Sequence, residues 1–290
     1  MLALGGLAFL LICVFGTYIA EGGSIGPVME ALPFEFATIG GAAIATFVIA
    51  NSMHAVKHTL RGFGKVLRGG LFKKGDYVEL LSLLFYFARL ANTKGTMALE
   101  VHIERPEESA AFRKFPKILG NHHATGMICD YLRMIGMNAD DPYQIEDVMA
   151  RELKKTLQEE LHSAHALQVV ADALPAFGIV AAVLGVIQTM AHIAQPPVVL
   201  GRMIGEALTG TFLGVLLAYG VAGPFAGRLQ SVAEEEAKYF EVIRAVLVAH
   251  LHGNAPQVSV ETGRKMAPNE YMPSFQEVET AIQTLQIEAS

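Results

Sequence analysis

The stretch DALPAFGIVAAVLGVIQTMAHIA, residues 172–194, decides the fold class. Between Asp172 and His192 it holds no ionisable residue. At 1.5 Å per residue, a helix of about 20 residues crosses the ~30 Å apolar layer of a bilayer. The stretch therefore predicts a membrane-spanning helix. It also has a proline near its start and small residues along its length, which a span that only faces lipid does not need.

Three other apolar runs have the same character, and they lie at residues 1–20, at about 36–54, and between Glu206 and Arg228. Hydrophobic residues make up 52% of the 290 residues and charged residues 17%, below the roughly 25% of soluble domains. The mean hydropathy is +0.38. We therefore predict an all-α integral membrane protein with four transmembrane helices. The first run has no preceding Lys or Arg and is too long for a cleaved signal peptide.

The distribution of positive charge predicts the orientation. Residues 55–172 hold sixteen of the 22 Lys and Arg and the tail from Arg228 holds five, whereas the loop at 21–35 holds none and the loop at 192–206 only Arg202. Because Lys and Arg favour the cytoplasmic side, both termini should be cytoplasmic. The predicted division is transmembrane helices 1 and 2 with a short periplasmic loop at 1–54, a cytoplasmic helical domain at 55–172, transmembrane helices 3 and 4 at 173–227, and a cytoplasmic C-terminal helix and tail at 228–290.

The large cytoplasmic segment is predicted to be helical. Residues 75–95 form an apolar run that ends at Gly95, a good helix terminator. Pro106 and Pro116 should bound short helices. Asp141 before Pro142 is typical of a helix start, and we expect that helix to continue through the third span. The fourth span should likewise extend into the cytoplasm and stop near Gly253.

Chemistry-bearing groups are scarce in the expected spans. Ionisable residues inside a membrane mark ion pathways, and the four runs hold none at mid-depth, with Glu206 near the outer end of the fourth. Either the chain forms no ion pathway or another chain supplies the charge. Without a phosphate-binding loop, a nucleophile motif or a complete set of metal ligands, we expect neither an enzyme nor a bound metal or cofactor. No basic patch indicates nucleic-acid binding.

Small and polar residues recur on the third and fourth spans. They are Gly178, Ala181, Ala182, Gly185 and Thr189 on the third, and Thr209, Gly210, Thr211, Gly214 and Gly220 on the fourth. Such residues allow helices to approach closely, either as ordinary packing or as a surface for another helix. Pro175 and Pro224 lie near the cytoplasmic ends of these spans, where each permits a bend.

Four segments carry a family resemblance: LPAFGIVAAVLGVIQTM (174–190), GTFLGVLLAYGVAGPFA (210–226), ALEVHIERPEES (98–109) and VETGRKM (260–266). With the four-span layout, the chain resembles the MotA family of flagellar motor stator subunits, within the MotA/TolQ/ExbB proton channels. The resemblance implies a bacterial inner-membrane protein that forms a pentameric ring around two copies of MotB, whose membrane helix supplies an aspartate. Proton flow past that aspartate would drive the ring against the rotor protein FliG. The small and Thr residues would form a wall against the MotB helix.

The same resemblance implies roles for individual residues. Pro175 and Pro224 would couple ion passage to movement. Sodium-driven relatives carry Thr where Ala182 stands, whereas Thr211 matches a Thr of both kinds, and Thr189 belongs to the same polar set. Because Na⁺ needs oxygen ligands in place of its water and alanine offers none, the coupling ion should be the proton.

A second set would contact the rotor. Glu100 matches an acidic residue of the family, but the basic residue expected eight positions earlier is Asn92 here. Arg89 and Lys94 flank that position and could substitute.

Two other functions fit parts of the pattern. A TolQ/ExbB-type energiser of another envelope process shares the plan of a ring with a partner helix, although those relatives have three spans. A membrane scaffold without ion flow is the second alternative.

Overall fold

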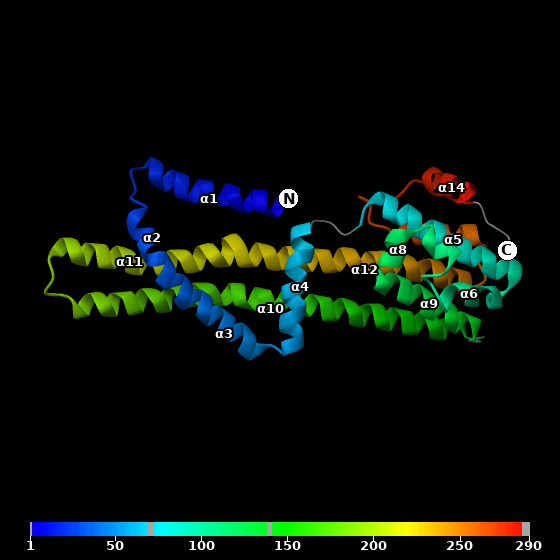
Figure 1. Cartoon of the computed structure of the whole chain (residues 1–290), viewed down its shortest axis with the longest axis horizontal. Coiled ribbons are helices and arrows are strands. Elements are labelled where there is room, and N and C mark those ends of the chain that lie inside the picture. The colour runs from blue at the N-terminus through cyan, green and yellow to red at the C-terminus, as the bar shows by residue number, and fades with distance from the viewer. Residues whose placement is uncertain (1, 69–71, 138–140, 286–290) are drawn as a thin grey trace. The chain divides into compact units, whose positions relative to one another are not determined.

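The chain is helical in the part that is described. A computed structural model describes residues 2–68, 72–137 and 141–285, and the elements in these ranges are all helices (Figure 1). The predicted all-α fold class is confirmed. The chain divides into two compact units. We call residues 1–69 and 159–233 the span unit, because it holds the apolar helices, and residues 70–158 and 234–290 the core unit.

The span unit contains the apolar helices. Its elements are α1 (Leu2–Ala20), α2 (Gly26–Glu35), the π-helical η1 (Phe36–Gly40), α3 (Gly41–Ala50), α4 (Met53–Arg68), part of α10 (Pro142–Ala191), α11 (Pro197–Val215), the π-helical η3 (Leu216–Ala222) and part of α12 (Gly223–Leu251). Three helices are long and apolar enough to cross a membrane, namely Gly26–Ala50, Pro142–Ala191 and Pro197–Leu251, and a shorter apolar helix covers Leu4–Ala20. The expected number of four spans stays a prediction.

Two of the apolar helices begin earlier than the sequence predicted. The second starts at Gly26 rather than near residue 36, and the fourth starts at Pro197 rather than beyond Glu206. In both, a proline (Pro27 and Pro197) occupies one of the first helical positions, where its fixed φ favours the helix and its missing N–H is not needed. Because both helices start earlier, Glu35 and Glu206 lie inside helices. Hydropathy located the apolar runs but not the starts of the helices.

Helix α4 packs on the long helices of the span unit. Val66 of α4 forms a small buried cluster with Ala164 of α10 and Leu229 of α12. His58 adds polar contacts to α10, because its Nδ1 lies 2.9 Å from Ser163 Oγ and its Nε2 lies 3.3 Å from Glu160 Oε1. These contacts hold α4, which directly follows the second apolar helix in the sequence, against α10 and α12.

The core unit holds the larger hydrophobic core. Its elements are α5 (Lys74–Lys94), the 3₁₀ helix η2 (Thr96–Leu99), α6 (Glu100–Ile103), α7 (Ala110–Arg113), α8 (Pro116–Gly120), α9 (His122–Gly136), α13 (Pro256–Met266), α14 (Phe275–Thr284) and the remaining parts of α10 and α12. Leu80, Phe87, Phe112, Ile128 and Val242 are fully buried in its core.

Three helix ends that the sequence predicted are confirmed, namely the end of α5, the start of α10 and the end of α12. Helix α5 ends before Gly95, which has a φ of 82°, and α12 ends shortly before Gly253, which has a φ of 84°. Asp141 Oδ1 accepts a hydrogen bond of 3.0 Å from Tyr143 N at the start of α10. Glycine adopts these left-handed conformations without steric cost, and an Asp caps free N–H groups.

A buried guanidinium fastens α13 to the segment that follows it. Arg264 is 7% exposed, and it donates hydrogen bonds to both carboxylate oxygens of Glu261, at 2.7 and 2.6 Å, and to Pro273 O at 2.9 Å. This pairing lowers the pKa of Glu261. A charged residue can be buried here because each of the three guanidinium nitrogens of Arg264 donates a hydrogen bond.

Candidate functional site

Helices α10 and α11 pack against each other through small residues. A Cβ atom added at Gly178 would lie 2.8 Å from Gly210 O and 3.1 Å from Gly214 Cα, and one added at Gly185 would lie 2.6 Å from Ala207 Cβ. These contacts run in opposite directions along the two helices, which lie side by side in Figure 1. We call this antiparallel contact the glycine seam, formed by Gly178, Ala181, Gly185, Ala207, Gly210 and Gly214.

The glycine seam changes one expectation about the small residues. The resemblance implied that they form a wall for a partner helix, but Gly178, Gly185, Gly210 and Gly214 are used in contacts within this chain. Helix α10 presents larger apolar side chains away from the seam, and Ile179, Val183 and Ile187 are between 52 and 60% exposed. A surface for another helix in this region therefore consists of aliphatic side chains rather than of these glycines.

The predicted channel residues lie at or beside the glycine seam. A Cβ atom at Gly178 would lie 3.3 Å from Thr211 Cα, so the half-buried Thr211 adjoins the seam. Ala182 is also half-buried and lies one turn along α10 from Gly178. Thr189 is 5% exposed, and its hydroxyl donates to Gly185 O at 2.9 Å. The seam thus gathers Thr211 and Ala182, whereas the Thr189 hydroxyl hydrogen is used within its own helix.

The two predicted prolines lie in different backbone surroundings. Pro175 is inside the continuous helix α10 and half-buried, and the carbonyl of the adjacent Leu174 would lie 2.8 Å from a Cβ atom at Gly214. Pro224 is exposed and is the second residue of α12, immediately after the π-helical η3. Gly223 N donates to Ala218 O, five residues back. The sequence predicted bends at both prolines but not the π-helical turns before Pro224.

Glu35 is a titratable group that the sequence reasoning missed. It is the last residue of α2 and lies inside the continuous apolar helix Gly26–Ala50. Its Oε2 is buried without a hydrogen-bond partner among the described residues. The sequence reasoning placed Glu35 outside the second apolar run, whereas it lies inside this apolar helix. Pro27 was the sequence signal that could have placed Glu35 inside it.

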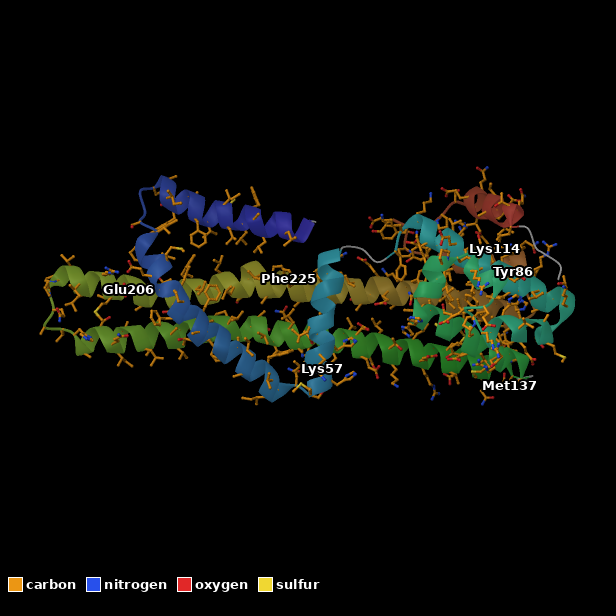
Figure 2. All side chains as sticks on the ribbon, viewed as in Figure 1. Lys57, Tyr86, Lys114, Met137, Glu206 and Phe225 are labelled. Carbon is orange, nitrogen blue, oxygen red and sulfur yellow. The ribbon has the colours of Figure 1, made fainter. Side chains whose placement is uncertain are left out.

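Charged residues at the start of α2 and α11 pair with one another. The guanidinium of Arg202 contacts Glu30 of α2, and its Nε lies 3.0 Å from Glu206 Oε1. Figure 2 labels Glu206 on α11. The loop between α10 and α11 is shorter than predicted, so Arg202 and Glu206 belong to a helix rather than to a loop.

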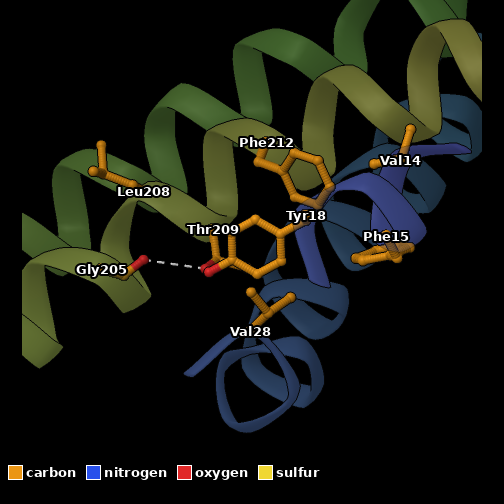
Figure 3. Close-up of a pocket in the computed structure, with 8 residues that line it drawn as sticks. All are labelled: Val14, Phe15, Tyr18, Val28, Gly205, Leu208, Thr209 and Phe212. Carbon is orange, nitrogen blue, oxygen red and sulfur yellow. Dashed lines mark hydrogen bonds between the residues drawn. The ribbon is translucent and has the colours of Figure 1, made fainter. Parts of the chain in front are cut away.

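An apolar pocket of about 280 Å³ lies between α1, α2 and α11 (Figure 3). Tyr18, Val28 and Phe212 contribute to its lining, and Phe15 meets Phe212 edge to face, with ring centroids 5.8 Å apart. Thr209 turns its hydroxyl to Gly205 O at 3.1 Å, as the dashed line in Figure 3 shows. The pocket offers apolar contact and no free charge among the residues that line it.

The residues expected to contact a rotor are all exposed. Arg89, Asn92 and Lys94 lie in the last turns of α5, and Glu100 begins α6. Arg89 and Asn92 are three residues apart and share a helix face, whereas Lys94 is two residues beyond Asn92 and lies on another face. The hydrophobic side chains of Met97 and Val101 are 79 and 78% exposed, and these residues lie three positions before and one position after Glu100 in the sequence.

Comparisons with known proteins agree across the chain. The Motility protein A N-terminal model matches residues 4–95 and the MotA/TolQ/ExbB proton channel family model matches residues 117–242. Motility protein A of Salmonella typhimurium is 37% identical over 98% of this chain and 96% of its own length, with the same values for Motility protein A of Escherichia coli. Chemotaxis protein LafT of Vibrio parahaemolyticus is 32% identical over 94% of this chain and 95% of its own.

Solved structures show the same fold. The structure of C. jejuni MotAB matches with a TM-score of 0.75 at 18% identity, covering 92% of this chain and 96% of that one. The flagellar MotAB stator complex of Bacillus subtilis matches with a TM-score of 0.70 at 22% identity, covering 96 and 98%. Together with the sequence identity to the enterobacterial proteins, these likenesses show that the chain belongs to the motility protein A family of the MotA/TolQ/ExbB proton channels.

Proposed function

We propose that the chain is a stator subunit of a bacterial flagellar motor, which generates torque from a proton flow. The observation that carries this proposal is the 37% identity to Motility protein A of Salmonella typhimurium across 98% of the chain. The glycine seam supports it, because it builds a closely packed helix pair from the two segments that most resemble the family.

The proposed location is the bacterial inner membrane. Three helices are long and apolar enough to span it, and α1, with 19 residues, would be the fourth span. Lys and Arg gather at residues 55–172 and after residue 228, which supports cytoplasmic termini by the positive-inside rule. The short turns after α1 and α10 would then face outward, together with the paired charges of Glu30, Arg202 and Glu206.

The proposed assembly is a pentameric ring around a MotB-type partner. The two solved structures described above are of MotAB proteins, which supports such a partner here. The aliphatic side chains of Ile179, Val183 and Ile187 offer it an exposed apolar row on α10. In a membrane, close packing and interhelical hydrogen bonds favour such association.

The proposed coupling residues are Pro175, Pro224, Thr211, Ala182 and Thr189. The half-buried Thr211 adjoins the glycine seam and can offer a hydroxyl beside it, whereas Ala182 offers no oxygen. Thr189 already donates its hydroxyl hydrogen to Gly185 O. This arrangement supports a proton rather than Na⁺ as the coupling ion, since Na⁺ needs several oxygen ligands.

The proposed rotor contact uses Glu100 and Arg89 and is directed at FliG. Both side chains are exposed, and Arg89 shares the helix face of Asn92, where the family carries a basic residue. Arg89 is therefore a better substitute than Lys94.

Charge reversal should expose this contact. Solvated ion pairs contribute only ~0–1 kcal/mol each, so Glu100→Gln should slow swimming slightly and Glu100→Lys more strongly, because repulsion replaces a weak attraction. Arg89→Glu should slow swimming more than Lys94→Glu does. The measurement is swimming speed at matched protein levels. Unchanged speed in both Arg89→Glu and Lys94→Glu would show that neither residue substitutes at Asn92.

Reconstitution tests the proposed function itself. In vesicles that carry a pH gradient, the chain with its MotB-type partner should dissipate the gradient, whereas the chain alone should leave it intact, because the partner supplies the aspartate that takes up the proton. Robust conduction by the chain alone, or none by the complex, would refute the proposal.

A further inference from the structure

Glu35 is an ionisable residue deep within an apolar helix. The helix Gly26–Ala50 has 25 residues, and Glu35 is the tenth. The other ionisable residue of this helix, Glu30, contacts Arg202, whereas the buried Oε2 of Glu35 has no partner among the described residues. Ionisable groups in membrane helices are costly and are usually kept for function. A buried carboxylate oxygen without a donor is tolerated best when it carries a proton.

The carboxyl group of Glu35 lies against the glycine seam. A Cβ atom added at Gly210 would lie 2.8 Å from Glu35 Oε2 and 3.1 Å from its Cδ, and 3.0 Å from Ala181 Cβ. The missing side chain at Gly210 therefore makes room for the carboxyl group next to α10 and α11. Thr211, the proposed channel residue, follows Gly210 directly. Glu35 thus reaches the helix pair that we propose lines the proton path.

The backbone on both sides of Glu35 departs from a regular α-helix. Pro33 lies inside α2 and cannot donate a hydrogen bond, which leaves the carbonyl four residues earlier free for water or a side chain. The π-helical η1 begins at Phe36, and π-helical turns inside α-helices are frequent at functional sites. Two distortions of the backbone therefore flank the buried and unpaired carboxylate oxygen of Glu35.

The charged groups on the apolar helices beside Glu35 lie on α2 and α11. On its own helix the nearest is Glu30, and on α11 they are Arg202 and Glu206, which pair with each other at 3.0 Å. Helix α10 offers none between Asp172 and His192. Two carboxylates with one guanidinium leave a net negative charge at the start of α2 and α11, which attracts protons.

We propose that Glu35 is a proton-binding carboxyl on the outer part of the path by which protons reach the partner's carboxylate. A proton from the outer side binds Glu35 Oε2 and neutralises the side chain among apolar neighbours. It then leaves to an acceptor deeper in the complex, and the carboxylate returns to its charged form. This inference rests on the proposed proton-conducting function, and it gives this chain an ionisable group of its own on the path.

Carbodiimide labelling tests the protonation directly. Dicyclohexylcarbodiimide is an apolar reagent that modifies protonated carboxyl groups in apolar surroundings, and peptide mass mapping locates the adduct. In the full complex in phospholipid vesicles, Glu35 should be labelled at acidic pH and less as the pH rises. The ion-paired Glu30 and Glu206 should stay unlabelled. An unlabelled Glu35 at every pH would overturn the proposal.

Proton flux separates a positioning role from proton transfer. Glu35→Gln should lower the flux of the assembled complex by roughly a hundredfold, within the range for positioned proton-transfer groups. Glu35→Asp should keep much of the flux and shift its pH profile. The matched control is Glu21→Gln, an exposed residue just after α1, which should conduct normally. Normal flux with an unchanged pH profile in Glu35→Gln would overturn the proposal.

Two further readouts keep the conclusions separate. If Glu35→Gln does not assemble, an unchanged pH profile in Glu35→Asp contradicts proton transfer and a shifted profile supports it. If the wild-type complex conducts no protons while Glu35 is labelled with the expected pH dependence, the proposed function fails and the protonation of Glu35 stands.

Discussion

Replacing Pro175 or Pro224 by alanine should almost abolish torque while the chain still folds and assembles with its partner. Each proline removes one backbone donor and disfavours a straight helix, at a cost of ~3 kcal/mol or more within a helix. Pro175 lies inside α10, and Pro224 is the second residue of α12, which follows the π-helical η3. Alanine restores the donor and favours a regular helix, so the variants should be at least as stable as the wild type.

The expected loss concerns switching between two bends. Protonation can shift a conformational equilibrium only by its differential interaction with the two states, and a straightened helix widens the energy gap that it must overcome. Co-purification of the partner and swimming speed should be measured in one strain, with Pro197→Ala at the start of α11 as the control. Failure to assemble would make the prolines structural, and normal swimming would show that no hinge is needed.

Gly178→Ala should strongly destabilise the span unit, although alanine favours a helix over glycine by ~1 kcal/mol. The new Cβ atom would lie 2.8 Å from Gly210 O and 3.1 Å from Gly214 Cα. Both are backbone atoms, which cannot move aside as a flexible side chain can. Overpacking of this kind typically costs ~1–3 kcal/mol, and the separation of α10 from α11 would also displace Thr211.

A glycine outside the glycine seam provides the matched control. A Cβ atom at Gly201, also in α11, meets nothing within 4 Å, so Gly201→Ala should be neutral or slightly stabilising. Thermal unfolding of the purified protein in detergent should show a lower midpoint for Gly178→Ala alone. Equal midpoints for both variants would show that the two helices separate at little cost.

Local signals in the sequence predicted the fold well where one residue decides a boundary. Asp141 and Pro142 start α10, and Gly95 and Gly253 follow the ends of α5 and α12 because their positive φ favours glycine. The small residues Gly178 and Gly214 predicted close approach of two helices, but not that the partner would be in the same chain. Spacing along one helix carries no information on which neighbour fills the gap.

Glu35 could not be found by hydropathy alone. A charged residue at the edge of an apolar run is usually interpreted as the end of a span. Here the helix starts at Gly26, nine residues before Glu35, and Pro27 is the signal for that start. The sequence also did not predict the π-helical segments η1 and η3. They arise when a helix accommodates an extra residue against its neighbours, so tertiary packing rather than local propensity decides them.

The π-helical segment η3 interrupts the regular hydrogen-bond pattern of its helix. Its hydrogen bonds reach back five residues, as Gly223 N to Ala218 O does, and the regular helices on both sides reach back four. The π-helical turn can shift along the helix by one residue if one backbone hydrogen bond breaks and a neighbouring one forms. The residue at the position of the shift then rotates by about 100° about the helix axis. Such a shift rotates the helix residue by residue, so its backbone hydrogen bonds need not all break at once. Local rotation of this helix therefore has a low-cost route that a perfect helix lacks.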